Sequence, residues 1–322
     1  MSTPADAPTK RLRILTWHVH GNYLYSLTSV PHDFFVPVHA DGRSGYSALG
    51  PGLPWGKNVT AIPAESISEH TFDCVIYQSR AVYEERASLL SDKQLALASI
   101  YIEHDPPFGD PTNTRHWFED RRGVLVHVTH YNALAWDAGE TVTRVIEHGV
   151  PIDPGIRYTG NLDRGICVIN NIQRRGRRMG ADIFDWARTR VPIDLIGMQS
   201  ELVGGLGEVS NSKVAQTVAN YRFFFTPIRY TSLGLALVEA MLIGVPVVGI
   251  AATELPTVIR NGENGFVHTD KQLVLDAMRA LLADPAMARQ WGAAGKETAM
   301  ARFGMPRFID DWNALLADVT RI

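Results

Sequence analysis

One carboxylic acid, Glu239, lies inside an apolar run that the sequence predicts to be a helix. The run opens near Gly234 and stops at Gly244, between a buried strand at residues 223–226 and a second apolar strand that begins after Pro246. An unpartnered carboxylate would cost several kcal/mol there, since even a neutral polar group costs roughly 2–7 kcal/mol. We therefore expect Glu239 to point into a polar cleft. If Glu239 is considered alone, the alternative is that it lies on the solvent-exposed edge of an ordinary amphipathic helix.

The loop ahead of that helix reads Thr231-Ser232-Leu233-Gly234. Its small residues leave backbone N–H groups free at a helix N-terminus, which is a place where phosphate binds. The carboxylate of Glu239, one turn further on, can accept hydrogen bonds from sugar hydroxyls beside that phosphate. The pattern therefore predicts a site for a nucleotide or a nucleotide sugar.

The whole stretch resembles the donor-site signature of retaining GT-B glycosyltransferases, in particular the family 4 group (glycosyl transferases group 1). The positions in register with that signature are Gly234, Leu235, Glu239, Ala240, Met241, Gly244, Pro246, Val247, Val248, Gly262, Asn264 and Gly265. The sequence departs from the family at Thr231, where the family has a glutamate, and at Ser232, where it has a glycine. It also has Thr253-Glu254 in place of a glycine pair.

The resemblance implies an α/β protein with the GT-B fold, in which two Rossmann-like, doubly wound parallel-sheet domains face a cleft. Short apolar runs that alternate with helical stretches in both halves indicate the same kind of sheet. We place the boundary at residues 148–153. Residues 1–153 then form an N-terminal acceptor-side domain and residues 154–305 a C-terminal donor domain. The resemblance further implies that a last helix at residues 306–322 packs back onto the first domain.

Charge is distributed unevenly between these halves. Residues 1–153 hold 12 Lys and Arg against 18 Asp and Glu, a net charge of −6, and the remainder holds 19 against 16, a net charge of +3. The basic groups are therefore in the half expected to hold a nucleotide diphosphate. The acidic half argues against nucleic acid or an anionic membrane surface as the main partner. No run approaches the ~18 apolar residues of a spanning helix, and no signal peptide is apparent, so we expect a cytoplasmic protein.

A histidine and an aspartate, His104 and Asp105, follow a predicted strand at residues 98–102. This is the edge of a parallel sheet at which ligands bind. The resemblance implies that a histidine here reaches the transferred sugar, and a loop residue without function is the alternative. His18, His20 and Gly21 occupy the first strand-to-helix turn, where the family has a glycine-rich loop near acceptor and diphosphate. The alternative for both histidines is that their imidazoles are simply exposed in the loop.

Four arginines follow the predicted strand at residues 165–169. By resemblance, Arg175 falls on a diphosphate-binding lysine of the family, and Asn170 falls on an arginine that Arg174 could replace. The alternative is that the four arginines form a solvated surface. Nucleic-acid binding through this run is disfavoured because no aromatic side chains accompany it on which bases could stack. The resemblance places the loops near Gly197, Met198 and Ser210 beside the donor base. Residues 41–57 form a long irregular excursion that we expect to cover the substrate, with a disordered insertion as the alternative.

These residues predict a glycosyltransferase that moves a sugar from a nucleotide-diphosphate sugar to an acceptor hydroxyl. His104, Glu239 and Thr231 would contact the donor sugar or ribose, while Arg175, a neighbouring arginine and the N–H groups of residues 232–235 would hold the diphosphate. The resemblance implies retention of configuration. No histidine spacing matches a ligand motif, so we predict no metal and no cofactor. The alternatives are a GT-B protein that binds a nucleotide sugar or a partner without turnover, and a nucleotide-sugar epimerase.

Overall fold

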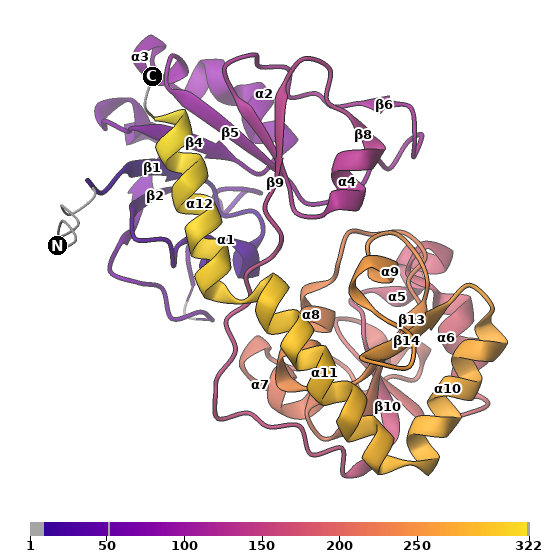
Figure 1. The fold of residues 1–322 in the computed structure, drawn as a ribbon. Coiled ribbons are helices and arrows are strands. Elements are labelled where there is room, and N and C mark those ends of the chain that lie inside the picture. The colour runs from indigo at the N-terminus through magenta and orange to yellow at the C-terminus, as the bar shows by residue number, and fades with distance from the viewer. Residues whose placement is uncertain (1–9, 51, 321–322) are drawn as a thin grey trace, which may run out of the picture.

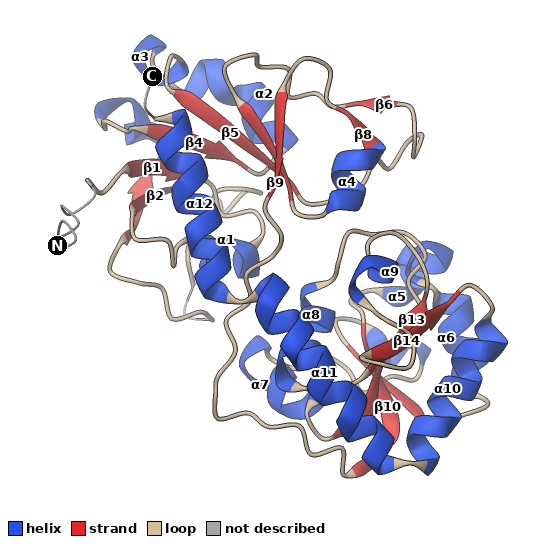
Figure 2. Cartoon of the chain, in the orientation of Figure 1, coloured by secondary structure: helices blue, strands red, loops and turns tan. Residues whose placement is uncertain are grey.

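The structure is a computed structural model that describes residues 10–50 and 52–320. It contains two parallel sheets, each flanked by helices, which lie in two separate domains (Figure 1, Figure 2). The chain passes from one domain to the other after β9 and returns through α11 and α12. The α/β fold class predicted from the alternating runs is therefore confirmed.

The first sheet has seven strands in the order β3-β2-β1-β4-β5-β7-β9, all parallel. Their bounds are β1 Arg13–Thr16, β2 Asp33–Val38, β3 Val59–Pro63, β4 Cys74–Tyr77, β5 Ala98–Glu103, β7 Val124–His127 and β9 Val142–Val145. Helices cover both faces, namely α1 Gly21–Leu27, η1 Ala64–Glu69, α2 Arg80–Leu89, α3 Asp92–Leu95 and α4 His130–Ala135. Neighbouring residues of one strand, such as Ile14 and Leu15, enter different hydrophobic clusters because side chains alternate across a sheet. The inner strands β4 and β7 are buried at every position for this reason, whereas the edge strands β3 and β9 are largely exposed.

The second sheet has five parallel strands in the order β11-β10-β12-β13-β14. Its strands are β10 Leu162–Val168, β11 Ile193–Ile196, β12 Tyr221–Thr226, β13 Val247–Ile250 and β14 Gly265–His268. Its helices are α5 Ile172–Arg175, η2 Gly176–Met179, α6 Ala181–Arg188, η3 Ser200–Val203, α7 Asn211–Val218, α8 Leu235–Ile243, α9 Leu255–Val258, α10 Lys271–Ala283 and α11 Pro285–Phe303. Helix α8 ends at Gly244, whose φ of 101° is left-handed and suits glycine.

The last helix, α12 Met305–Val319, lies against the first domain (Figure 1). Its apolar side chains Phe308, Trp312 and Leu316 belong to the same hydrophobic cluster as Ile14 and Leu24. The guanidinium of Arg307 donates hydrogen bonds to the carbonyls of residues 147 and 148, at 2.8 and 2.7 Å. The C-terminal segment therefore packs on the N-terminal sheet and holds the linker between the domains.

Two helices differ in length from what their sequence patterns predict. The pattern at residues 132–138 predicts one helix, but α4 ends at Ala135, because Trp136 and Asp137 form the short strand β8 (Trp136–Asp137), which pairs with β6 (Thr114–Arg115). The pattern at residues 285–291 predicts an amphipathic helix, and α11 begins there but continues to Phe303, with Gly292 packed so closely on the Gly244 carbonyl that a side chain would collide with it.

Candidate active site

A cleft of about 790 Å³ lies between the two domains. Its walls come from segments that follow β1 and β5 in the first domain, from segments that follow β10, β11 and β12 in the second, and from α8. Ligands of parallel α/β sheets bind at this carboxyl edge of the strands. The volume lies within the range of small-molecule sites, roughly 300–1,000 Å³.

Glu239 lines this cleft from the second turn of α8. Its neighbours Val238 and Ala240 are completely buried, whereas Glu239 itself is half-buried. Burial raises the pKa of Glu239 to about 7, and no charged neighbour or hydrogen bond opposes that shift. The carboxylate is therefore held at the cleft in an environment that disfavours its charge, and it lacks a protein partner among the described residues.

The loop Thr231-Ser232-Leu233-Gly234 forms the wall next to Glu239, and all four residues line the cleft. Within the described chain, the backbone N–H groups of residues 232–235 donate to no protein oxygen. The hydroxyl of Ser232 is buried and has no partner either. Free donors at the start of a helix are what an anionic group needs.

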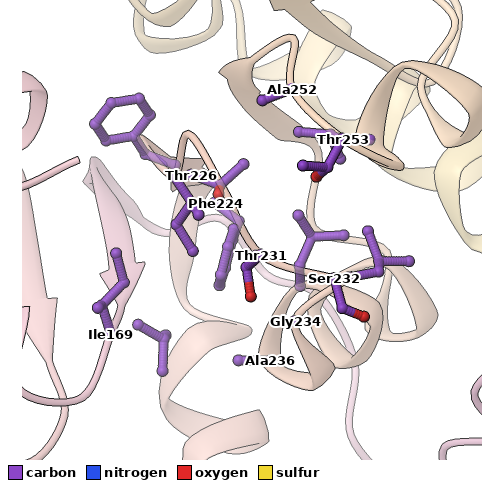
Figure 3. Close-up of a pocket in the computed structure, with 15 residues that line it drawn as sticks. Ile169, Phe224, Thr226, Thr231, Ser232, Gly234, Ala236, Ala252 and Thr253 are labelled. Atoms are coloured by element: carbon purple, nitrogen blue, oxygen red, sulfur yellow. The ribbon is translucent and has the colours of Figure 1, made fainter. Parts of the chain in front are cut away.

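Figure 3 shows residues of this loop that also line a second, smaller cavity of about 50 Å³. Thr231 and Ser232 line it from one side and Ala252 and Thr253 from the loop after β13. Gly234 has an ordinary φ of −68°, and a Cβ placed on it would meet no atom within 4 Å. A side chain at this position would therefore meet a ligand before it met the protein.

His104 lines the cleft from the opposite domain. Its Nε2 lies 3.1 Å from Oε1 of Gln78, while the amide nitrogen of Gln78 faces the Trp17 carbonyl at 3.4 Å. A carbonyl only accepts, so Gln78 presents its oxygen to His104, and Nε2 of His104 carries the proton. The Nδ1 atom of His104 therefore has no proton and can accept a hydrogen bond. Gln78 was missed by the sequence analysis, although it directly follows β4 and so stands at the same sheet edge.

Two more histidines and a tyrosine surround His104. The His20 and Tyr23 rings lie 4.0 and 4.7 Å from it, and Tyr23 also contacts His148 at 5.9 Å between ring centroids. Burial is the main cause that holds the pKa of His104 well below its usual range, and the nearby His20 and His148 lower it further. Burial lowers the pKa of His148 to about 4. His20 touches solvent but lies inside the cleft, where lost hydration lowers its pKa. His104 and His148 are therefore hydrogen-bonding groups rather than cations near neutral pH.

His148 was predicted only as part of the linker between the domains. It lines the cleft, is buried, and has an Nδ1 atom without a partner. A hydrogen bond with the backbone of Leu233 partly opposes the lowering of the His148 pKa. His148 thus lies between Tyr23 of the first domain and the α8 loop of the second.

Of the four arginines after β10, Arg175 lines the cleft. Burial and the charge of Arg178 lower the pKa of Arg175, whereas Asp105 across the gap raises it. Arg178 lies over the Phe108 ring at 4.6 Å, and Arg177 pairs with Asp182 at 2.7 Å.

Three predicted positions do not line the cleft. Arg174 is exposed, because consecutive residues of a helix point about 100° apart and only Arg175 faces inward. His18 directs Nδ1 at the carbonyls of Ser47 and Ala48, at 3.3 and 3.2 Å, and so holds the irregular excursion. Ser210 also lies outside the lining, although both of its sequence neighbours belong to it.

The remaining predicted residues Gly21, Asp105, Gly197, Met198 and Leu235 all belong to the lining. Asn170 lines it too, and its Oδ1 accepts a hydrogen bond from the Met198 N–H at 2.9 Å. None of the described residues of the excursion, 41–50 and 52–57, lines the cleft, and three of them border a separate cavity of about 490 Å³.

The described residues contain no group of three His, Cys, Asp or Glu side chains arranged to hold a metal ion. No helix in the described part of the chain has the length and apolar character needed to cross a bilayer.

Comparison with solved structures identifies the architecture. A glycosyltransferase from Rickettsia africae aligns with a TM-score of 0.71 at 13% identity, covering 97% of this chain and 99% of that one. HepE of Anabaena in complex with UDP and glucose aligns with a TM-score of 0.69 at 14% identity, covering 96% and 100%. The protein therefore has the GT-B fold expected from its donor-site motif.

Comparison of sequences shows which family part of this chain is similar to. Residues 199–298 match the family of glycosyl transferases group 1. An N-acetyl-alpha-D-glucosaminyl L-malate synthase of Bacillus anthracis is 32% identical over 92 residues, 28% of this chain and 24% of that protein. A phosphatidyl-myo-inositol mannosyltransferase of Mycobacterium leprae is 31% identical over 120 residues, 36% of this chain and 30% of that protein. The matches span a third or less of these relatives. The similarity to the glycosyl transferases group 1 family thus covers residues 199–298, which include the donor-site motif around Glu239.

Proposed function

We propose that the protein is a retaining, metal-independent glycosyltransferase that moves a sugar from a nucleoside-diphosphate sugar to an acceptor hydroxyl. The observation that carries this proposal is a single cleft that joins free N–H donors, a cation and an unpartnered carboxylate. The first two suit a diphosphate and the third suits the hydroxyls of a ribose or a hexose. The family match supports the same chemistry.

In this reaction the anomeric carbon loses its bond to a diphosphate oxygen and gains one to the acceptor oxygen, whose proton passes to the departing diphosphate. Negative charge grows on the leaving group. Arg175 and the N–H groups of residues 232–235 are placed to stabilise it, which lowers the barrier because these groups are oriented in advance. Neither Arg174 nor Arg178 lines the cleft, but the charge of Arg178 acts on Asp105 in the cleft wall as well as on Arg175, so we assign the second cationic contribution to Arg178.

The transferred sugar would lie between His104 of the first domain and Thr231 of the second. Glu239 would accept hydrogen bonds from donor hydroxyls, and its raised pKa of about 7 would fall when those donors arrive. We assign the acceptor to the wall made by His20, Gly21 and Asp105, and the base to the wall at Gly197 and Met198. Residues 1–153 would then be the acceptor side and residues 154–305 the donor side.

Two observations favour a second candidate, a protein that binds a nucleotide sugar without turnover. Thr231 supplies one neutral hydroxyl where the family has a carboxylate, and the Oδ1 atom of Asn170 is already bonded to Met198. Both changes remove contacts that would act on the sugar or on the diphosphate.

A two-stage experiment separates these candidates. First, a panel of nucleoside diphosphates and their sugars is screened by thermal shift, since a ligand of the folded state raises the melting temperature. The donor that binds is then incubated with hydroxyl acceptors and with EDTA, and the anomeric configuration of the product is read by NMR. Transfer that survives EDTA and is lost in His104→Ala supports the proposal. Saturable binding without transfer or donor hydrolysis would favour the second candidate, and interconversion of the donor sugar would favour an epimerase.

A further inference from the structure

A buried carboxylate outside the cleft holds the turn that carries His104 and Asp105. Glu103 is the last residue of β5 and is 7% exposed. Its Oε1 accepts the backbone N–H of Asp105 at 2.9 Å, and its Oε2 lies 3.0 Å from Nε2 of His116. On the other side, the indole N–H of Trp136 donates to the Asp105 carbonyl at 2.8 Å. Both backbone polar groups of Asp105 are thus bonded to buried side chains.

The hydrogen bonds of His116 define its role. Its Nδ1 accepts the backbone N–H of Phe118 at 3.0 Å, so Nδ1 has no proton and Nε2 has one. The imidazole therefore donates to Glu103. Burial lowers the pKa of His116 to about 3, which keeps the ring neutral. Burial raises the pKa of Glu103, but both of its oxygens face donors, which is the arrangement that a carboxylate needs.

The chain between β5 and β7 is built to bring these groups together. After Asp105 it leaves the first sheet, and its short strand β6 pairs with β8. The backbone N–H of His116 donates to the Asp137 carbonyl at 2.8 Å, so His116 and Trp136 arrive side by side, with their rings 4.8 Å apart. The side chain of His116 is fully buried.

Such a buried polar pair is poorly explained by stability. Taking a carboxylate out of water is expensive, and well-packed apolar residues of similar volume often stabilise a fold as well or better. The pair does, however, fix a backbone position that apolar side chains could not hold by hydrogen bonds.

We propose that Glu103, His116 and Trp136 are positioning residues that fix Asp105 and the adjoining His104 at the acceptor wall of the cleft. This inference rests on the proposed glycosyltransferase function, because it assigns the three residues to the placement of that site. None of them lines the cleft. Among the groups proposed to bind the donor, His104 lies in the first domain and those assigned to the diphosphate lie in the other domain, so loss of the positioning unit lowers kcat much more than it changes the KM for the donor.

The first test is Glu103→Gln, which keeps the size and the acceptor for Asp105 but turns an N–H toward the Nε2–H of His116. We expect kcat to fall roughly 10- to 100-fold, as small misplacements of a reacting group do, with the donor KM within about twofold. The backbone N–H of Asp105 should also exchange with deuterium faster. The matched control is Glu119→Gln in the same crossover, an exposed carboxylate paired with Arg115, which should behave as wild type.

The double variant Glu103→Leu with His116→Phe separates positioning from stability. It removes the cost of burying the polar pair but also the acceptors of the Asp105 and Phe118 backbone N–H groups, each of which costs about 1–3 kcal/mol. We therefore expect a lower melting temperature, and kcat measured well below that temperature, where the variant is folded, should stay low. Wild-type kcat in the folded variants, or unchanged exchange at Asp105, would overturn the inference while leaving the function intact. If wild-type protein transfers no sugar to any acceptor, the proposed function fails instead, and deuterium exchange still decides whether Glu103 holds the turn.

Discussion

Replacing Glu239 by glutamine should make the protein more stable and less active. The structure explains the first effect, because the carboxylate is held where burial raises its pKa from 4.5 to about 7. Below about pH 4.5 the group is neutral in folded and unfolded chains and costs nothing. Between pH 4.5 and about pH 7, Glu239 ionises in the unfolded chain but keeps its proton in the folded protein. The free energy of unfolding therefore falls as the pH rises through this range.

The size of the effect follows from the shift. One pKa unit corresponds to about 1.4 kcal/mol, so the carboxylate costs about 3 kcal/mol at pH 8 and less than about 1 kcal/mol at pH 5. A neutral amide escapes this cost. With roughly 2–4 °C per kcal/mol for a domain of this size, Glu239→Gln should raise the Tm by about 6–12 °C at pH 8.

The loss of activity has a different cause. Glutamine offers one acceptor oxygen and one donor group where the carboxylate offers two charged acceptors. A hydrogen bond to a charged group contributes about 1.5–3 kcal/mol, so transfer should fall roughly 10- to 100-fold. Stability is measured by urea unfolding and differential scanning calorimetry at pH 5 and 8, and activity by initial rates of transfer.

The matched control is Glu297→Gln, which changes an exposed carboxylate on α11 and should alter neither quantity. The reasoning is refuted if Glu239→Gln is no more stable than wild type at pH 8. It is also refuted if the gain in stability is the same at pH 5, because the proposed cost exists only when the carboxyl group is ionised.

Three further predictions test the walls of the cleft. Gly234→Val should weaken nucleoside-diphosphate binding at least about tenfold by calorimetric titration while the Tm stays within about 2 °C, because the new Cβ would meet no protein atom within 4 Å. Arg175→Ala should weaken binding by a similar factor, as loss of a charge-assisted hydrogen bond does, whereas Arg174→Ala should not; equal effects would contradict the assignment of Arg175. Glu254→Ala should lower the free energy of unfolding by about 1–3 kcal/mol in urea, because the N–H of Tyr131, in the other domain, loses its acceptor at 2.7 Å; an unchanged midpoint would contradict this.

The sequence patterns located most of the secondary structure near the site. The helix α8 and its flanking strands follow from local rules, since apolar runs, a glycine stop and a proline restart act between residues close in the chain. Residues that follow a strand were also placed at the carboxyl edge of a sheet, and His104 and Asp105 do line the cleft there. Gln78 satisfies the same rule and was overlooked.

For other residues, the direction of the side chain decides whether the residue lines the cleft. Arg174 and Arg175 are neighbours in sequence with the same chemistry, yet they point in different directions on α5. His18 turns toward the excursion instead of the cleft because carbonyls of that segment lie beside it. Residue type and spacing contain no information on these rotations.

Two parallel sheets, the helix that presents Glu239 and the donor motif could all be predicted from local patterns, because these depend on short-range periodicity and on backbone preferences of glycine and proline. The convergence of Glu103, His116 and Trp136 on the backbone of Asp105, and the contact of Glu254 with Tyr131 in the other domain, became visible in the folded structure alone. Those contacts join residues that are well separated in the chain. They form only when crossovers and domains take up one particular packing, which local patterns leave undetermined.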